Sequence, residues 1–353
     1  MDVRLSPEQV ALRDSAVQVV DRLGLRVVTD LDDIERVVKL DAAVTASGWR
    51  ELRTASDEGG PWASAVEVAV VAEELGRGLA DVPFFGPTMA ADLRRLAGAA
   101  AATAPETVVL TADLSALARA RDARLSESGL AVDARGAASA VVLQRQPADS
   151  EPGWGVGSLS VSAGPAADGV DLTRGVAPCP SGSSVSDLSE PGRSLDDDDL
   201  SRWHSLGLAV GCADLVGVMR GAIALAADYA RERKQYGATI GSFQAVQHLL
   251  ADAQVAMEGS RSIALHAAWA VDALSGPDAL ATASSAKAYC ARAARAVCET
   301  AIQVHGGIGN TWDCLAHVYL RRALLSTELL GGIGINLDRV LASRGIGGDD
   351  GLR

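Results

Sequence analysis

A charged side chain and an amide flank one short junction in the C-terminal half of the chain, in the stretch YARERKQYGATIGSFQAVQHLLAD at residues 229–252. Arg233 comes before this junction and Gln244 after it, with Gly237 between them. Glycine suits the end of a helix and Ser242 suits the start of the next, so the stretch predicts two helices joined by a short loop. A guanidinium and an amide at such a junction can bind a phosphate and a nucleotide. From these residues alone, a helical hairpin with a solvated charged end is the alternative.

A second candidate site is the glycine-rich segment QVHGGIGN at residues 303–310. Its adjacent glycines, Gly306 and Gly307, let another molecule approach the backbone closely, and free N–H groups there can bind a phosphate or a ribose. An ordinary helix end followed by a turn needs the same residue types. The glycines alone therefore leave both a cofactor site and a structural turn open.

Composition and charge argue against several classes of protein. Hydrophobic residues make up 48% of the 353 residues but aromatic residues only 4%, which favours helices packed through small side chains. The formal net charge of −13 argues against a general nucleic-acid binder. Charged residues interrupt the alanine-rich segments, so we expect no membrane span. The five cysteines form no CxxC pair, which predicts no metal site and a reducing, cytoplasmic location.

The order of patterns along the chain predicts a mostly α protein in three parts. Residues 1–105 read as an N-terminal helical domain and residues 106–195 as a small middle β domain. Residues 196–353 read as an antiparallel bundle of the four-helix type, because long helical periods alternate with short connections. The first expected helix begins at Ser6. The other expected helices cover residues 32–47, 62–79, 88–98, 200–233, 242–274, 278–304, 313–327 and 332–343. Expected strands include residues 108–110, 140–143 and 159–162.

Together, the two motifs and the three-part order resemble the acyl-CoA dehydrogenase family of flavoproteins. The resemblance is specific in ERKQYGATIGSFQAVQHLLAD and AIQVHGGIGNTWDCLAHVYLRRA, and fair in LSPEQVALRDS and AEELGRGLADVPF. It is weak in the middle of the chain, where residues 171–174 match best, and it covers nearly the whole length. The resemblance implies FAD as the cofactor, an acyl-CoA substrate of fatty acid or steroid side-chain metabolism, and an oligomer.

The resemblance also implies which residues contact the cofactor. In this family, the positions of Arg233, Phe243 and Gln244 hold the pyrophosphate and adenosine of FAD. The second motif contacts FAD through Gln303, Val304, His305, Gly306 and Gly307. These groups normally reach the flavin of a neighbouring subunit, usually in a dimer or a dimer of dimers.

The chain departs from the family where the chemistry would occur. The family base is a glutamate that removes the α-proton of the acyl thioester while the flavin accepts the β-hydride. The matching position holds Leu330, and the position used by other members, on the first bundle helix, holds Gly207. Glu328 lies close to the expected position, but a carboxylate at a helix end is more often solvated. Residues 110–113 are a poor counterpart of the segment that lines the flavin ring.

Three functions are compatible with this pattern. The chain resembles the small, base-less subunit of heteromeric actinobacterial acyl-CoA dehydrogenases, which would hold the FAD of a catalytic partner subunit. It can also be a homodimeric or tetrameric flavoenzyme with another chemistry, such as a monooxygenase or a carrier-protein-linked dehydrogenase. The third function is that of a non-catalytic relic that binds a partner without flavin. We interpret Trp269 and Trp312 as core aromatics rather than flavin stackers.

Overall fold

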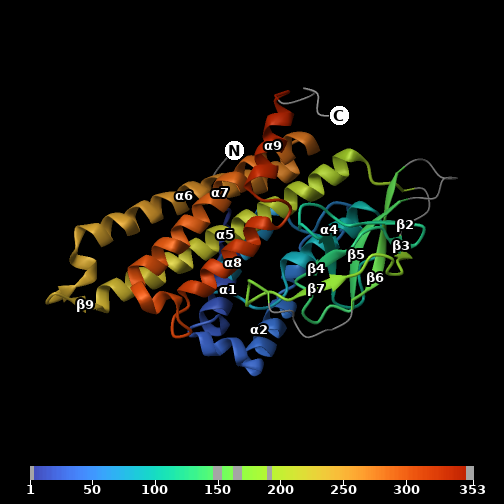
Figure 1. Cartoon of the computed structure of the whole chain (residues 1–353). Coiled ribbons are helices and arrows are strands. Elements are labelled where there is room, and N and C mark those ends of the chain that lie inside the picture. Colours follow the sequence, from blue (N-terminus) through green and yellow to red (C-terminus); the bar gives the residue numbers. More distant parts are fainter. Residues whose placement is uncertain (1–3, 146–152, 162–168, 189–192, 347–353) are drawn as a thin grey trace.

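Three blocks of secondary structure follow one another along the chain (Figure 1). The computed structural model describes residues 4–145, 153–161, 169–188 and 193–346. The N-terminal helices pack against the C-terminal helical bundle, and the sheet formed by the middle of the chain lies at one end of the molecule (Figure 1). The predicted fold class, mostly α with a middle β part and a C-terminal bundle, is confirmed.

The N-terminal block contains α1 (Pro7–Leu23), α2 (Ile34–Ala46), α3 (Ala65–Arg77) and α4 (Phe85–Leu96), with 3-10 turns η1 (Val28–Asp32) and η2 (Trp49–Glu51). The predicted start of the first helix is confirmed: the Ser6 hydroxyl accepts a hydrogen bond from the Gln9 N–H at 3.2 Å, and the Gln9 side chain accepts one from the Ser6 N–H. Helix α4 begins at Phe85 rather than at residue 88. Pro87 fits its first turn, where no backbone N–H is needed.

The middle block forms a mixed sheet. Its strands are β1 (Glu106–Thr111), β2 (Arg119–Arg121), β3 (Arg124–Leu125), β4 (Gly129–Val132), β5 (Ser139–Arg145), β6 (Trp154–Ser160), β7 (Val176–Cys179) and β8 (Ser186–Asp187). The order is β3-β2-β5-β1-β4-β7, and β6 pairs with β5 and β8. Strand β1 runs parallel to β5, with Val108 opposite Val141. The predicted strands at 108–110 and 140–143 are confirmed; of 159–162, residues 159 and 160 lie in β6 and residue 162 lies outside the described residues.

The described part of the C-terminal bundle contains α5 (Asp197–Glu232), α6 (Gln244–Ala273), α7 (Gly276–His305), α8 (Ala316–Glu328) and α9 (Ile333–Ser343). Helix α5 packs against α3, α6, α7 and α8 and is the central helix of the molecule. It is long and apolar enough to cross a membrane, but 78% of its most apolar window is buried inside the protein. That burial is what a core helix shows.

The junction between α5 and α6 is a β-hairpin and not the simple loop that the sequence predicted. It consists of β9 (Lys234–Gln235), β10 (Ala238–Thr239) and the 3-10 turn η3 (Ile240–Ser242). Tyr236 and Gly237 have φ angles of 51° and 82°, as the two central positions of a type I′ turn require. Gly237 therefore serves a hairpin instead of a helix end. Ser242 does not cap α6, because its hydroxyl donates to the carbonyl of Thr239.

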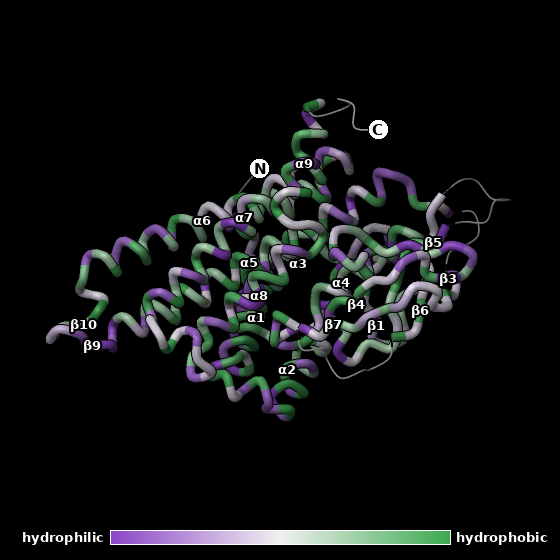
Figure 2. The backbone as a smooth tube through the Cα atoms, in the orientation of Figure 1, coloured by the Kyte–Doolittle hydropathy of each residue, from purple (hydrophilic) through white to green (hydrophobic). Residues whose placement is uncertain are grey.

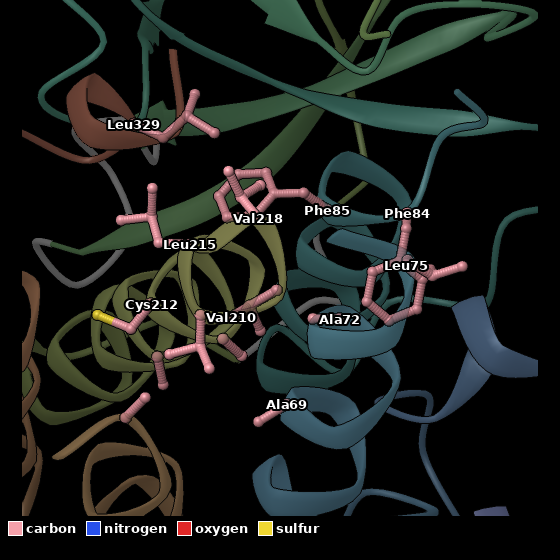
Figure 3. Close-up of a cluster of buried hydrophobic side chains, with 14 of the residues drawn as sticks. Ala69, Ala72, Leu75, Phe84, Phe85, Val210, Cys212, Leu215, Val218 and Leu329 are labelled. Carbon is pink, nitrogen blue, oxygen red and sulfur yellow. The ribbon is translucent and has the colours of Figure 1, made fainter. Parts of the chain in front are cut away.

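A hydrophobic core joins α3 to α5 (Figure 3). The cluster contains Ala72 and Leu75 of α3, Phe84 and Phe85 at the start of α4, and Val210 and Leu215 of α5 (Figure 3). The end of α5 that leads into β9 is hydrophilic instead (Figure 2). The buried residues of α5 therefore lie mainly between Trp203 and Ala222, and the end that leads into β9 projects from the bundle.

Candidate functional site

The first group of predicted cofactor residues lies on the surface at the hairpin end of the bundle. Arg233 directly follows α5 and Gln244 opens α6, and both residues are exposed. Neither side chain hydrogen-bonds or ion-pairs with another described residue. Phe243, which is 38% exposed, contacts Tyr236 edge to face, with the ring centroids 6.5 Å apart. The hairpin thus presents a guanidinium, an amide and an aromatic ring outward.

The glycine-rich segment lies at the same end of the bundle as this hairpin. Helix α7 ends at His305, and the 3-10 turn η4 (Gly306–Asn310) follows. The buried His305 imidazole donates from Nδ1 to the carbonyl of Ala301 at 2.7 Å. Its ring stacks on Tyr229 of α5, with the centroids 4.5 Å apart. This contact joins the last turns of α5 and α7, so the two sequence motifs meet at one end of the bundle.

Burial divides the predicted residues of the second motif into two groups. Gln303, Gly306 and Gly307 are exposed, whereas Val304 and His305 are buried. Gly306 has φ 68° and ψ −145°, a conformation that only glycine adopts without strain. The space above both glycines is open, because an added Cβ would meet no atom within 4 Å. Val304 and His305 therefore support the segment from inside, and the glycines leave their backbone open to a ligand.

We call the exposed residues at this end the clasp: Arg233, Phe243, Gln244, Gln303, Gly306 and Gly307. These residue types fit a dinucleotide such as FAD. A planar guanidinium matches a pyrophosphate through parallel N–H groups. The glutamine amides can donate to and accept from ribose hydroxyls. Open glycine backbone permits close approach of a phosphate or a sugar.

The two positions expected to carry a base are apolar and touch each other. Leu330 is fully buried in the turn between α8 and α9 and packs against Gly207 of α5. A Cβ added at Gly207 would lie 2.2 Å from Leu330 Cδ1 and 3.0 Å from Met89 Cε. Hydrocarbon therefore occupies both positions at which the sequence resemblance predicts a carboxylate in other family members.

The loop after β1 closes directly onto this turn. The Leu330 N–H donates to the Leu114 carbonyl at 2.7 Å. Arg339 of α9 donates to the Leu330 carbonyl at 2.8 Å and to the Ser115 carbonyl at 3.2 Å. Residues 110–113, the counterpart of the flavin-lining segment, lead straight into this contact. Direct hydrogen bonds therefore join the loop to the bundle where the resemblance predicts the flavin ring, and we call this region, with Leu330 and Gly207, the closed cleft.

A buried ion-pair network lies at the junction of the three blocks. Asp214 of α5 accepts from Arg322 of α8 at 2.7 and 3.0 Å and pairs with Arg174 at 3.0 Å. Burial alone would raise the pKa of the Asp214 carboxyl, but the two guanidiniums outweigh it and hold the pKa at about 2. The cavity beside these groups measures about 10 Å³, room for one water but not for a flavin ring.

Sequence reasoning missed this network. Its one signal is the position of Asp214, the lone charged residue in the apolar stretch LGLAVGCADLVGVM. A buried carboxylate needs a cationic partner, but the sequence does not show which arginine provides it. Arg322 lies 108 positions further along the chain.

Glu328, the remaining candidate base, lies outside the closed cleft. Its side chain is exposed at the end of α8 and lies against the backbone of Gly332. It lines an open surface groove that Arg292 and Arg295 of α7 also line. Leu330 and Gly207 do not line this groove, so Glu328 faces a different surface from the expected base position.

A buried lysine fixes the end of α8. Lys287 of α7 donates from Nζ to the carbonyls of Ser326 at 2.5 Å and Leu329 at 2.8 Å. Burial lowers the pKa of Lys287 to about 8. The ammonium thus satisfies carbonyls of the last helical turn and holds the backbone next to Leu330. Sequence reasoning missed this residue too, because a lysine on an alanine-rich helix is usually solvated.

Trp312 lies on the surface, so its interpretation as a core aromatic is wrong. The indole is 62% exposed in the turn between η4 and α8. Trp269, by contrast, is half-buried in α6 and stacks on His266, with the centroids 5.7 Å apart. The apolar period of the sequence places Trp269 on a helix. No period covers the turn that carries Trp312, so the sequence could not show that this side chain faces solvent.

Comparison with known proteins identifies the family. Residues 208–344 match the acyl-CoA dehydrogenase C-terminal domain. IpdE2 of Mycobacterium tuberculosis, an acyl-CoA dehydrogenase by name, is 31% identical over 275 residues, which are 77% of this chain and 76% of IpdE2. The chain belongs to the acyl-CoA dehydrogenase family of FAD-dependent oxidoreductases.

Two further relatives show how far the likeness extends. FadE34 of Mycobacterium tuberculosis, also named an acyl-CoA dehydrogenase, is 41% identical over 141 residues, which are 40% of this chain and only 20% of FadE34. A chain of the ChsE4-ChsE5 complex from the same organism has a TM-score of 0.76 at 22% identity, covering 98% of this chain and 99% of that chain. The fold is therefore shared over nearly the whole length.

Proposed function

We propose that this chain is the FAD-clasping subunit of a heteromeric acyl-CoA dehydrogenase. The complex would desaturate an acyl-CoA thioester between its α and β carbons. A catalytic partner subunit would supply the glutamate base and most of the acyl pocket. This chain would complete the cofactor site from the outside with its clasp.

The contact between Leu330 and Gly207 carries this proposal. In this family a carboxylate at one of these two positions removes the α-proton, and here a buried leucine packs on a glycine. Three described carboxylates lie near this turn. Glu328 faces the outer groove and Asp214 is bound by two arginines. Asp113 is exposed on the loop after β1 and accepts from the hydroxyls of that loop. We therefore assign the base to the partner subunit.

The open clasp supports the second half of the proposal. Arg233, Gln244 and Gln303 face solvent at the opposite end of α5 from the closed cleft. FAD, when bound, supplies the acceptor for the β-hydride. The arginine would neutralise its pyrophosphate and the glutamines would orient its ribose, so that this chain binds and positions a cofactor whose ring lies in the neighbouring subunit.

The proposed complex is cytoplasmic. All five cysteines are buried free thiols, a state that a reducing compartment allows. A homodimer or tetramer of this chain is the alternative assembly, and it would bind flavin without any partner.

Co-expression with full-length acyl-CoA dehydrogenases from the same genome tests the proposal. The chain alone should purify without flavin, and the co-expressed pair should carry FAD and acyl-CoA dehydrogenase activity. Yellow, active protein from this chain alone would refute the proposal and favour a homo-oligomeric flavoenzyme. Colourless protein in both preparations would also refute it and favour a partner-binding protein without a cofactor.

A further inference from the structure

Large apolar side chains are exposed at the clasp end of the bundle, although aromatic residues are only 4% of the chain. Trp312 is 62% exposed, Ile308 41% and Tyr236 96%. Single exposed apolar residues are common on protein surfaces, but several at one end of a bundle mark a binding surface. Ile308 lies within η4 and Trp312 just after it. The clasp as defined above gives neither a role, and of the two only Trp312 carries an aromatic ring.

The turn that carries Trp312 holds the indole in place. The Thr311 N–H and hydroxyl both donate to the Ile308 carbonyl, at 3.0 and 2.8 Å, and the Asp313 N–H donates to the Thr311 hydroxyl at 3.3 Å. The buried His317 imidazole contacts the indole edge to face, with the ring centroids 5.1 Å apart and the planes at 79°. The indole is therefore supported by the protein on one side and open to solvent on the other.

The support under the indole is uncharged. Burial, together with the nearby Arg321, lowers the pKa of His317, so its imidazole is neutral at pH 7. Its Nε2 has no hydrogen-bond partner in the part of the chain that the structure describes. His317 therefore packs against the indole as an aromatic ring and adds no charge to the surface.

We infer that Trp312 stacks on the adenine ring of the FAD whose pyrophosphate the clasp binds. This inference rests on the proposed function. The Tyr229–His305 contact places the end of α5 beside the start of η4, and Trp312 lies two residues after the end of η4. A nucleotide held by its phosphates at Arg233 and the glycines has its base free to reach the next surface group. Every nucleobase has a π face that an aromatic side chain can cover.

The surroundings of the indole favour a base over an apolar side chain of the partner subunit. Asn310 and Asp313 flank it in the same turn, and both are exposed. Their side chains can bond the amino group and ring nitrogens of adenine. An apolar side chain docked on Trp312 would bury these polar groups without partners, which costs free energy.

Equilibrium binding of FAD and of FMN to the co-expressed complex tests the inference, because FMN lacks the adenine. Trp312→Ala should weaken FAD binding by about 5- to 150-fold, the range found when a base loses its aromatic stacking partner. FMN affinity should stay within about twofold of the wild type. Trp312→Phe should retain most of the FAD affinity, since a phenyl ring still stacks.

The control is Trp62→Ala. Trp62 is also exposed, at 71%, but it lies near the start of α3, whose Ala65 N–H bonds Asp272 at the far end of α6. This variant should bind both flavins like the wild type. Unchanged FAD affinity in Trp312→Ala, or an equal loss of affinity for FAD and FMN, would overturn the inference. Dissociation of the partner subunit from the Trp312→Ala complex would also overturn it, because Trp312 would then contact the partner. If the stacking of Trp312 is overturned but Arg233→Ala still weakens FAD binding, the proposed function stands. If the wild-type complex binds no FAD, the proposed function and the stacking of Trp312 are both refuted.

Discussion

Leu330→Ala probes the closed cleft most directly. Leu330 is fully buried, and its Cδ1 approaches Gly207 and Met89, so truncation removes buried hydrocarbon and leaves a gap. Leu→Ala changes in well-packed cores cost about 3–5 kcal/mol. We expect about 3 kcal/mol here, because the flexible Met89 side chain can move into part of the gap. For a cooperative chain of 353 residues, this lowers Tm by about 4 °C.

Turnover by the complex should not change, since a leucine transfers no proton. The assay is calorimetry of the co-expressed complex together with kcat on an acyl-CoA substrate. A fall in kcat of about 10²-fold or more, with flavin content and fold retained, would refute the reasoning, because effects of that size belong to groups at the reacting centre.

A compensating substitution sharpens this test. Gly207→Ala alone places a Cβ 2.2 Å from Leu330 Cδ1, and overpacking of this kind costs about 1–3 kcal/mol, partly offset by about 1 kcal/mol of helix preference for alanine. In the Leu330→Ala background, the new methyl group fills part of the gap. The double variant should therefore be about 1–3 kcal/mol more stable than the sum of the single changes predicts. Additive effects would contradict the contact between these two positions.

Three further predictions concern other sites. Arg233→Ala should lower the FAD affinity of the complex about 10- to 100-fold by removing charged hydrogen bonds, as measured by flavin retention on dialysis. The control Arg231→Ala, two positions away and paired with Asp228, should retain flavin like the wild type. Equal losses in the two variants would argue against a specific pyrophosphate contact. Glu328→Gln should leave kcat within about twofold, and a loss of 10²–10⁴-fold would identify Glu328 as the base. Asp214→Asn should destabilise the complex by about 3–5 kcal/mol at pH 7. It removes the carboxylate paired with the buried Arg322 and leaves the buried Arg174 with Asp133 alone. The pKa of Asp214 is held at about 2, so its ionised form contributes stability that is complete above about pH 4 and is lost as the pH falls toward 2. The difference in free energy of unfolding between wild type and variant, measured by urea denaturation, should therefore shrink over that pH range. A constant difference would contradict the ion pair.

Helix periods and caps allowed much of the architecture to be predicted. The capping box at Ser6 and the long apolar periods of the bundle are local signals, and the structure has helices where they predict them. The hairpin at Tyr236 and Gly237 was not predicted, because a single glycine is compatible with both a helix end and a type I′ turn. Tyrosine rarely adopts a positive φ, so its sequence gives little warning of this turn.

The candidate site was less accessible to sequence reasoning. The two motifs can be read from residue types, and Leu330 and Gly207 can be seen to lack a proton acceptor. That these two positions touch each other depends on how α5 and the α8–α9 turn pack, which no local pattern encodes. The same holds for the pairing of Asp214 with Arg322 and for the exposure of Trp312.

The number of FAD molecules per complex tests the central claim most directly. With this chain's own cleft closed and only its clasp open, one FAD should bind for each pair made of this chain and its catalytic partner. Flavin absorbance and native mass spectrometry of the co-expressed complex give this ratio. Two FAD molecules per pair would contradict the account, because the second could bind only in the cleft that Leu330 and the Asp214 network close.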